Sequence, residues 1–186
     1  DFLKYHPHVE FNIEGYPNEE FLQLIDAIKP DQCTLVPDGE EQLTSDHGWN
    51  VVENRATLLG VLGDLREKNI RSSLFLDPDL EMLEQVPSVG ADRIELYTED
   101  YASNFARPEQ DAVLERYRLT AQRTGQLGIG LNAGHDLDLQ NLSKFLEIPN
   151  ILEVSIGHAL VVESLQLGVA EVISRYLAIV DGEGIE

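Results

Sequence analysis

The sequence predicts an α/β fold with a parallel sheet. Strand-like and helix-like segments alternate six times along the 186 residues. No turn dipeptide such as Asn-Gly joins two strands directly into a hairpin, and strands that alternate with helices pair in parallel through right-handed crossovers. The predicted strands are residues 8–15, 33–37, 71–76, 93–97, 127–131 and 152–156. The predicted helices are residues 19–29, 51–68, 79–89, 109–125, 138–147 and 160–179.

The first two units are indicated by periodicity and by turn residues. Residues 8–15 alternate apolar and polar side chains, which is typical of a strand. Asn18 is a suitable N-cap for helix 19–29, and Pro30 ends that helix. Segment 33–37 is short and apolar, so we expect a buried strand followed by a polar stretch and then the amphipathic helix 51–68.

The later units repeat this pattern. Strand 71–76 is closed by Asp77 and Pro78, and Pro87 weakens the short helix that follows it. A polar loop up to Pro108 separates strand 93–97 from its helix. The last two strands both run into turns that contain glycine and histidine. We assign residues 1–180 to one domain and the polar residues 181–186 to a tail.

Two architectures fit this alternation, an open doubly wound sheet and a TIM (β/α)₈ barrel. No Gly-x-Gly-x-x-Gly segment follows the first strand, which disfavours a dinucleotide-binding sheet. Dividing 186 residues by six gives 31 per unit, and eight such units would reach the roughly 250 residues of a barrel. We therefore expect a barrel of which about six βα units are present, lacking the first two.

Composition excludes several classes of function. The chain carries 13 Lys and Arg against 34 Asp and Glu, a net charge of −21, which disfavours binding to nucleic acid or to an acidic membrane. Small anions remain possible ligands, because helix N-termini bind phosphate through backbone N–H groups. Cys33 is the only cysteine, so a disulfide framework and a multi-cysteine metal site are excluded. No apolar run is long enough to span a bilayer, and we expect a cytoplasmic protein.

Polar residues collect where the predicted strands end, which is the active-site face of a barrel. They are Glu14, Asp77, Glu95, Asn132, His135 and His158. Histidine titrates near neutral pH, and burial raises the pKa of a carboxyl group, so Glu14, Glu95 and His135 could exchange protons with a carbonyl substrate. Glu14 would equally suit a half-solvated strand, and a single histidine in a glycine-containing turn is usually structural.

Seven segments resemble the pyridoxine 5′-phosphate synthase family, in the order and at the spacing of that family. They are Phe11 to Glu14, Leu35 to Pro37, Leu43 to Trp49, Ser73 to Asp77, Ile94 to Thr98, Leu131 to Leu137 and Ser155 to Ala159. The resemblance implies a TIM barrel that assembles into homo-oligomers, commonly octamers. It also implies condensation of 1-deoxy-D-xylulose 5-phosphate with 3-amino-2-oxopropyl phosphate to pyridoxine 5′-phosphate, without a cofactor or a metal ion.

The resemblance also assigns roles to residues. Glu14 matches the proton acceptor of the family, His135 the proton donor, and Glu95 a glutamate that stabilises charged intermediates. Thr44, Asp136, Gly157 and His158 match substrate-binding positions, with Asp136 contributing its backbone N–H. We expect one phosphate at Gly157 and His158, because the following helix start is electropositive.

The chain also departs from the family. The Asn-x-Asp-His motif and the basic loop of the first two family strands have no counterpart in it. We therefore expect this chain alone to bind at most one substrate well and to turn over neither. Two alternatives remain open, another barrel enzyme that acts on phosphosugars and a truncated, non-catalytic barrel.

Overall fold

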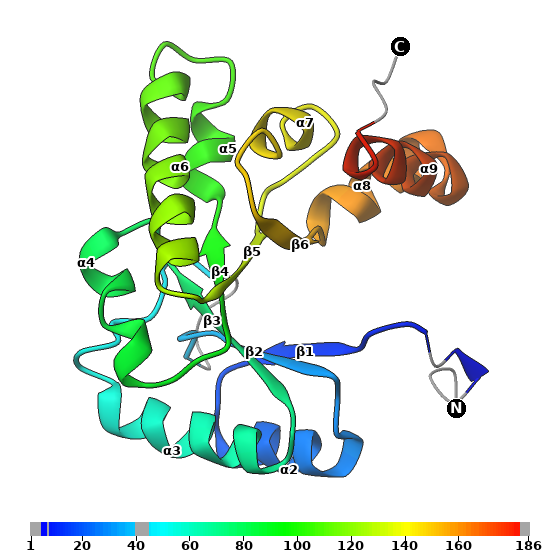
Figure 1. The fold of residues 1–186 in the computed structure, drawn as a ribbon. Helices are drawn as coiled ribbons and strands as arrows, with labels where there is room; N and C mark the ends of the chain where they lie inside the picture. Colours follow the sequence, from blue (N-terminus) through cyan, green and yellow to red (C-terminus); the bar gives the residue numbers. More distant parts are fainter. Residues whose placement is uncertain (1–4, 7, 40–44, 183–186) are drawn as a thin grey trace.

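The computed structural model of the chain describes residues 5–6, 8–39 and 45–182. Six strands form one parallel sheet, paired in chain order from β1 to β6 and curled along its width (Figure 1). They are β1 (Asn12–Gly15), β2 (Gln32–Leu35), β3 (Arg71–Leu76), β4 (Arg93–Tyr97), β5 (Gly130–Gly134) and β6 (Ile151–Ser155). The order never reverses, as it does in a doubly wound sheet, so the predicted partial TIM barrel is confirmed.

Helices separate the strands, as the alternation predicts. They are α2 (Glu19–Ile28), α3 (Arg55–Glu67), α4 (Leu80–Leu83), the 3₁₀ turn η1 (Val86–Ser88), α5 (Glu99–Asn104), α6 (Gln110–Gln126), α7 (Leu142–Phe145), α8 (His158–Leu167) and α9 (Val169–Val180). Asn18 caps α2 as predicted, since its side chain accepts a hydrogen bond from the Phe21 N–H at 2.8 Å. Lys29, in the left-handed conformation, ends that helix just before Pro30.

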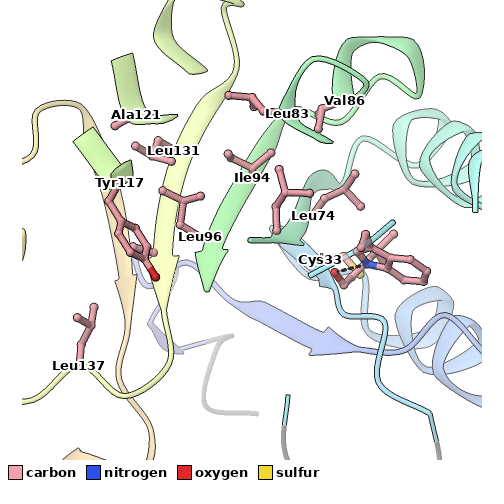
Figure 2. Packing of buried hydrophobic residues seen from close by; sticks show 14 of the residues in the cluster. Cys33, Leu74, Leu83, Val86, Ile94, Leu96, Tyr117, Ala121, Leu131 and Leu137 are labelled. Atoms are coloured by element: carbon pink, nitrogen blue, oxygen red, sulfur yellow. Dashed lines mark hydrogen bonds between the residues drawn. The ribbon is translucent and has the colours of Figure 1, made fainter. Parts of the chain in front are cut away.

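The hydrophobic core lies between the sheet and these helices (Figure 2). Successive side chains of a strand point to opposite faces. In β4, Ile94 and Leu96 are fully buried in this core beside Tyr117 of α6 (Figure 2), whereas Arg93 and Glu95 face the inside of the curled sheet. The alternation therefore places the apolar residues under the helices and leaves the polar ones for the barrel interior.

A polar network fills the interior at the N-terminal ends of the strands. Gln32 of β2 donates to Glu153 Oε1 of β6 at 3.0 Å, and Arg71 Nε donates to Gln32 Oε1 at 2.7 Å. One Arg93 nitrogen donates to Asn132 Oδ1 at 3.0 Å and lies 3.3 Å from Glu153 Oε2. Because β2 and β6 are four strands apart in the order, their contact shows how tightly the sheet curls.

Four strands differ from their predicted bounds; β2 and β6 differ by one or two residues at an end, and β1 and β5 differ more. The predicted strand 8–15 pairs only from Asn12 onward, because its partner β2 begins at Gln32. The predicted strand 127–131 is wrong at its start. Gly128 has a positive φ of 73°, and the Ile129 N–H donates to the Thr124 carbonyl at 3.2 Å, so this segment closes α6 and the strand begins at Gly130.

The predicted helices are right in place but not in extent. The one over 79–89 divides into α4 and η1, and Pro87, which has no N–H to donate, lies inside η1. The polar loop before Pro108 contains α5, and the predicted helix 138–147 contracts to α7. The predicted helix 160–179 is two helices, because Gly168, with φ 90° and ψ 141°, breaks it.

The last two helices carry an apolar surface that no described part of the chain covers. None of the residues of α8 is buried. Among the large apolar residues of these two helices, Leu165 is the most exposed, at 84%. The exposed apolar residues of this α8–α9 surface are Val161, Val162, Leu165, Leu167, Val169, Ile173, Leu177 and Val180. No helix within the described residues is long and apolar enough to cross a membrane.

Candidate active site

A cavity of about 580 Å³ opens at the carboxyl ends of the strands. Its walls include Glu14, Glu95, His135, Asp136, Gly157 and His158, which are six of the seven residues to which the family resemblance assigns a role. The seventh, Thr44, lies outside the described residues. The remaining lining residues are Asp38, Ser45, Phe75, Ser155, Ile156 and Val161. Glu14, Glu95 and His135, which lie at predicted strand ends, therefore share one cavity.

Glu95 is the most buried charged residue of this cavity, with 1% of its surface exposed. Burial, and after it the Glu14 carboxylate, together raise the pKa of Glu95 to about 8, while a hydrogen bond from Ser155 opposes the shift. Its Oε2 atom is buried and has no hydrogen-bond partner among the described residues. A carboxyl group held neutral in this way can donate a hydrogen bond to a bound ligand.

Gly134 makes room for this carboxyl group. A Cβ on Gly134 would lie 2.1 Å from Glu95 Oε1 and 3.0 Å from the Ser155 Cβ. Real Cβ atoms do not approach so closely, so any side chain at position 134 would displace Glu95. Gly134, in the Asn-Ala-Gly-His turn, thus leaves the space that the Glu95 carboxyl group of the neighbouring strand occupies.

Glu14 lies at the end of β1, at the edge of the sheet. Its side chain is exposed, but its carboxyl group forms part of the cavity wall. Loss of water at that wall raises the pKa of Glu14, and the nearby Asp38 carboxylate raises it again, while His135 opposes the shift. A carboxylate with a raised pKa is a stronger base.

His135 stands at the start of the turn that follows β5. Its Nδ1 lies 2.8 Å from Asp136 Oδ2. The edge of its ring contacts Tyr97 with a centroid distance of 5.0 Å, and His158 lies 6.4 Å away. Both His135 and Asp136 have positive φ angles, 83° and 58°, a conformation that is uncommon outside glycine. The turn places His135 in the wall of the cavity that Glu14, Glu95 and the start of α8 also line.

The start of α8 forms the last wall. Gly157 is the N-cap of that helix and His158 is its first residue. No described atom lies within 4 Å of the position that a Cβ on Gly157 would take. The N-terminus of the helix is electropositive and its first N–H groups lack partners within the helix, so a small anion can approach the backbone here.

Two of the polar residues predicted at strand ends, Asp77 and Asn132, do not line this cavity. Asp77 belongs to a neighbouring cavity of about 630 Å³, and its Oδ2 accepts a hydrogen bond from the Gly48 N–H at 3.0 Å. Asn132 is buried in the N-terminal polar network. Within the described residues, no group of three or more His, Cys, Asp or Glu side chains could hold a metal ion.

Sequence reasoning missed three polar residues of the cavity, Asp38, Ser45 and Ser155. Ser155 sits two positions after Glu153 on β6, so the alternation of that strand would have placed it inside the barrel. Asp38 follows β2, and its Oδ2 accepts a hydrogen bond from the Ser45 hydroxyl. No periodicity signals Asp38, because it lies in a loop.

Comparisons with known proteins agree with this geometry. The sequence profile of the family described as Pyridoxal phosphate biosynthesis protein PdxJ matches residues 1–182. A pyridoxine 5′-phosphate synthase from Christiangramia forsetii is 46% identical over 171 residues, which are 91% of this chain and 72% of that protein. One from Bacteroides fragilis is 48% identical over 168 residues, 90% of this chain and 70% of that protein.

Solved structures show the same fold at low identity. A mandelate oxidase variant crystallised with benzoyl-formic acid matches with a TM-score of 0.61 over 94% of this chain and 57% of that one. The two sequences are 11% identical, so this likeness concerns the fold alone.

Proposed function

This chain belongs to the PdxJ family of pyridoxal phosphate biosynthesis proteins, and we propose from that membership that it is a pyridoxine 5′-phosphate synthase. The reaction joins 1-deoxy-D-xylulose 5-phosphate to 3-amino-2-oxopropyl phosphate and forms pyridoxine 5′-phosphate, inorganic phosphate and water. The observation that supports it in the structure is the gathering of Glu14, Glu95 and His135 around one cavity. Ring closure between two carbonyl compounds requires such groups to exchange protons.

Each of the three groups suits a different part of that chemistry. Glu14 removes protons from the substrates, since its raised pKa makes its carboxylate a stronger base. His135 returns protons to departing oxygens. Its Nδ1 contacts Asp136 at 2.8 Å, which assigns proton exchange with the substrate to Nε2. Glu95, neutral through burial, donates a hydrogen bond where negative charge develops on oxygen.

One substrate phosphate is held by backbone N–H groups of Gly157, His158 and Asp136. No Lys or Arg is found among the described residues that line the cavity, so side-chain cations do not supply the attraction there. Arg71 and Arg93 lie in the polar network at the opposite end of the strands. The dipole of α8 is therefore the main positive element available to a phosphate.

The remaining proposals concern partners and location. The α8–α9 surface exposes apolar side chains, and contiguous apolar surface is typical of an interface. We assign that surface to a second copy of this chain, in a homo-oligomer. The protein acts in the cytoplasm on small phosphorylated substrates, without a cofactor and without nucleic-acid partners, in accord with its net charge of −21.

Ligand binding provides the first test of this function. The melting temperature is measured with 1-deoxy-D-xylulose 5-phosphate, with pyridoxine 5′-phosphate and with ribose 5-phosphate as the control sugar phosphate. We expect a rise with the reaction's substrate or product that exceeds the rise with ribose 5-phosphate. Equal rises would favour another phosphosugar enzyme, and no rise with any ligand would favour a non-catalytic barrel.

Turnover provides the second test. Both substrates are mixed with the chain, and pyridoxine 5′-phosphate is identified by its mass. Product formed by the wild type and reduced at least a hundred-fold by Glu14→Gln would establish the activity and contradict the expectation that this chain alone is inactive. Equal product from the wild type and from Glu14→Gln would contradict the role of Glu14.

A further inference from the structure

The turn that carries His135 is strained and needs support from outside itself. His135 and Asp136 both adopt positive φ angles, 83° and 58°. A non-glycine residue in this region costs about 1–3 kcal/mol, and it persists where surrounding contacts hold it. Two such residues in succession therefore raise the question of what fixes their carbonyl groups.

Thr98 supplies one of these contacts. It follows β4 directly and is fully buried. Its N–H donates to the Gly134 carbonyl at 3.0 Å, and its hydroxyl lies 2.8 Å from the same oxygen. The hydroxyl also contacts the carbonyl oxygen of His135. The single hydroxyl proton therefore lies between two acceptors, the carbonyl oxygens of Gly134 and His135, and holds both of them.

The position of Thr98 makes this contact unusual. Thr98 is the N-cap of α5, a place where a threonine hydroxyl ordinarily accepts a hydrogen bond from the first turn of the helix. Here the side chain makes no such capping bond. The helix start thus forgoes a stabilising contact, and the hydroxyl is turned toward the residue that carries the imidazole.

Asn141 supplies the matching contact on the next residue. Its side-chain Nδ2 donates to the backbone carbonyl of Asp136 at 3.0 Å. The backbone carbonyl of Asn141 accepts a hydrogen bond from the Tyr101 hydroxyl at 2.8 Å. Asn141 is 3% exposed and Tyr101 is fully buried. Both carbonyl groups of the strained pair are therefore held by buried side chains that belong to other parts of the chain.

We propose that Thr98 is a positioning residue, which fixes the backbone of His135 through its hydroxyl so that the imidazole keeps one orientation in the cavity. Asn141 fixes Asp136 in the same way, and Asp136 in turn contacts His135 Nδ1 at 2.8 Å. This inference rests on the proposed function only for its consequence in catalysis, since the orientation of His135 can be measured in the absence of turnover.

The test compares variants that change one hydroxyl group. Thr98→Val keeps the shape and removes the donor, and Thr98→Ser restores it. Thr124→Val is the matched control, because Thr124 is equally buried and its hydroxyl donates to the Thr120 carbonyl at 2.8 Å, inside α6. The imidazole signals of His135 are recorded by nitrogen–proton NMR at one fixed pH.

We expect one sharp set of His135 ring signals in the wild type, in Thr98→Ser and in Thr124→Val. Thr98→Val should give broadened or multiple ring signals, because the backbone of His135 is no longer fixed and the imidazole takes more than one orientation relative to Asp136. Unchanged signals in Thr98→Val would overturn the proposal. If Thr98→Val does not fold, the wild type alone provides the test. An NMR signal from the Thr98 hydroxyl proton, protected from exchange and close to His135, would support the proposal, and its absence would overturn it.

Kinetics separates this inference from the proposed function. Where the wild type forms product, Thr98→Val should lower kcat about ten- to a hundred-fold with KM within three-fold, and Thr98→Ser should recover most of it. A wild type that forms no product bears on the activity of this chain and not on the role of Thr98, which the NMR comparison then tests. A normal kcat in Thr98→Val counts against the role of Thr98 alone.

Discussion

At the scale of single residues, the chemistry of the cavity depends on a carboxyl group that is kept away from water. Glu95 is 1% exposed, and burial raises its pKa to about 8. In the unfolded chain the same group ionises near its ordinary pKa of about 4.3. Between these two values the folded state binds more protons than the unfolded state, so this group lowers stability as pH rises.

The pH dependence of stability therefore changes when Glu95 is replaced. The side chain in Glu95→Gln is neutral in both the folded and the unfolded state. The free energy of unfolding of this variant, relative to the wild type, should therefore increase from pH 5 to pH 8 by on the order of 1–3 kcal/mol. Urea unfolding of both proteins at the two pH values measures this difference. Glu53→Gln, which removes a carboxylate from the exposed surface, is the control and should show no such gain. A constant difference between Glu95→Gln and the wild type would contradict a raised pKa.

A second prediction concerns the phosphate. Gly157→Ala places a methyl group in the space beside the N-terminus of α8, where no described atom lies within 4 Å. The fold should tolerate it, since φ at Gly157 is −104°, but the anion would be kept from the backbone N–H groups. We expect phosphate-ligand affinity to fall about ten-fold or more, by calorimetric titration. Unchanged affinity would place the phosphate elsewhere.

Sequence reasoning reached the site residues more readily than their surroundings. Glu95, between two apolar residues of a strand, and the two glycine–histidine turns stand out in a single sequence. The role of Gly134 does not, because its constraint is the Glu95 carboxyl on the neighbouring strand. The contact of Thr98 with His135 is equally hidden, since the two residues are far apart in the chain. Contacts between strands require the register of the sheet.

At the scale of elements, the bounds of a strand could be predicted from the sequence where turn or loop residues stand on both sides of it. Strands β3 and β4 begin and end where the sequence predicts. Helices were harder, because hydrophobic periodicity continues across a break. Gly168 lies inside one apolar pattern, and only its backbone conformation, φ 90° and ψ 141°, divides α8 from α9.

This break gives a prediction for stability. The conformation of Gly168 belongs to a region that side chains rarely adopt, so Gly168→Ala should lower the free energy of unfolding by about 1–3 kcal/mol. Gly60→Ala is the control, because Gly60 lies inside α3 with no described atom within 4 Å of an added Cβ. That variant should be stabilised by about 0.5–1 kcal/mol. Denaturant unfolding of both distinguishes them, and an equal gain in both would contradict the strain.

At the scale of the whole molecule, the charge and the apolar surface act in opposite directions. The net charge of −21 repels copies of the chain from one another. The exposed side chains of the α8–α9 surface favour association. We expect the apolar surface to prevail, and the wild type to sediment as a homo-oligomer.

The substitution that tests this is Leu165→Lys, at the most exposed residue of that surface, 84%. Lysine changes the net charge from −21 to −20, so any dissociation cannot arise from added repulsion. Leu119→Lys on α6, where the leucine is 47% exposed, is the control. Analytical ultracentrifugation should show a smaller species for Leu165→Lys alone. A monomeric wild type, or dissociation by both variants, would contradict an interface at α8–α9.

The hydrogen bond between Gln32 and Glu153 joins residues that are 121 positions apart. No local event during folding can form it, because β3, β4 and β5 must first bring β2 and β6 into register. We expect such a bond to form late in folding, after the rate-limiting barrier, so that it has to break before the sheet can open. The polar network beneath the cavity should therefore slow the unfolding of the native molecule more than it speeds folding.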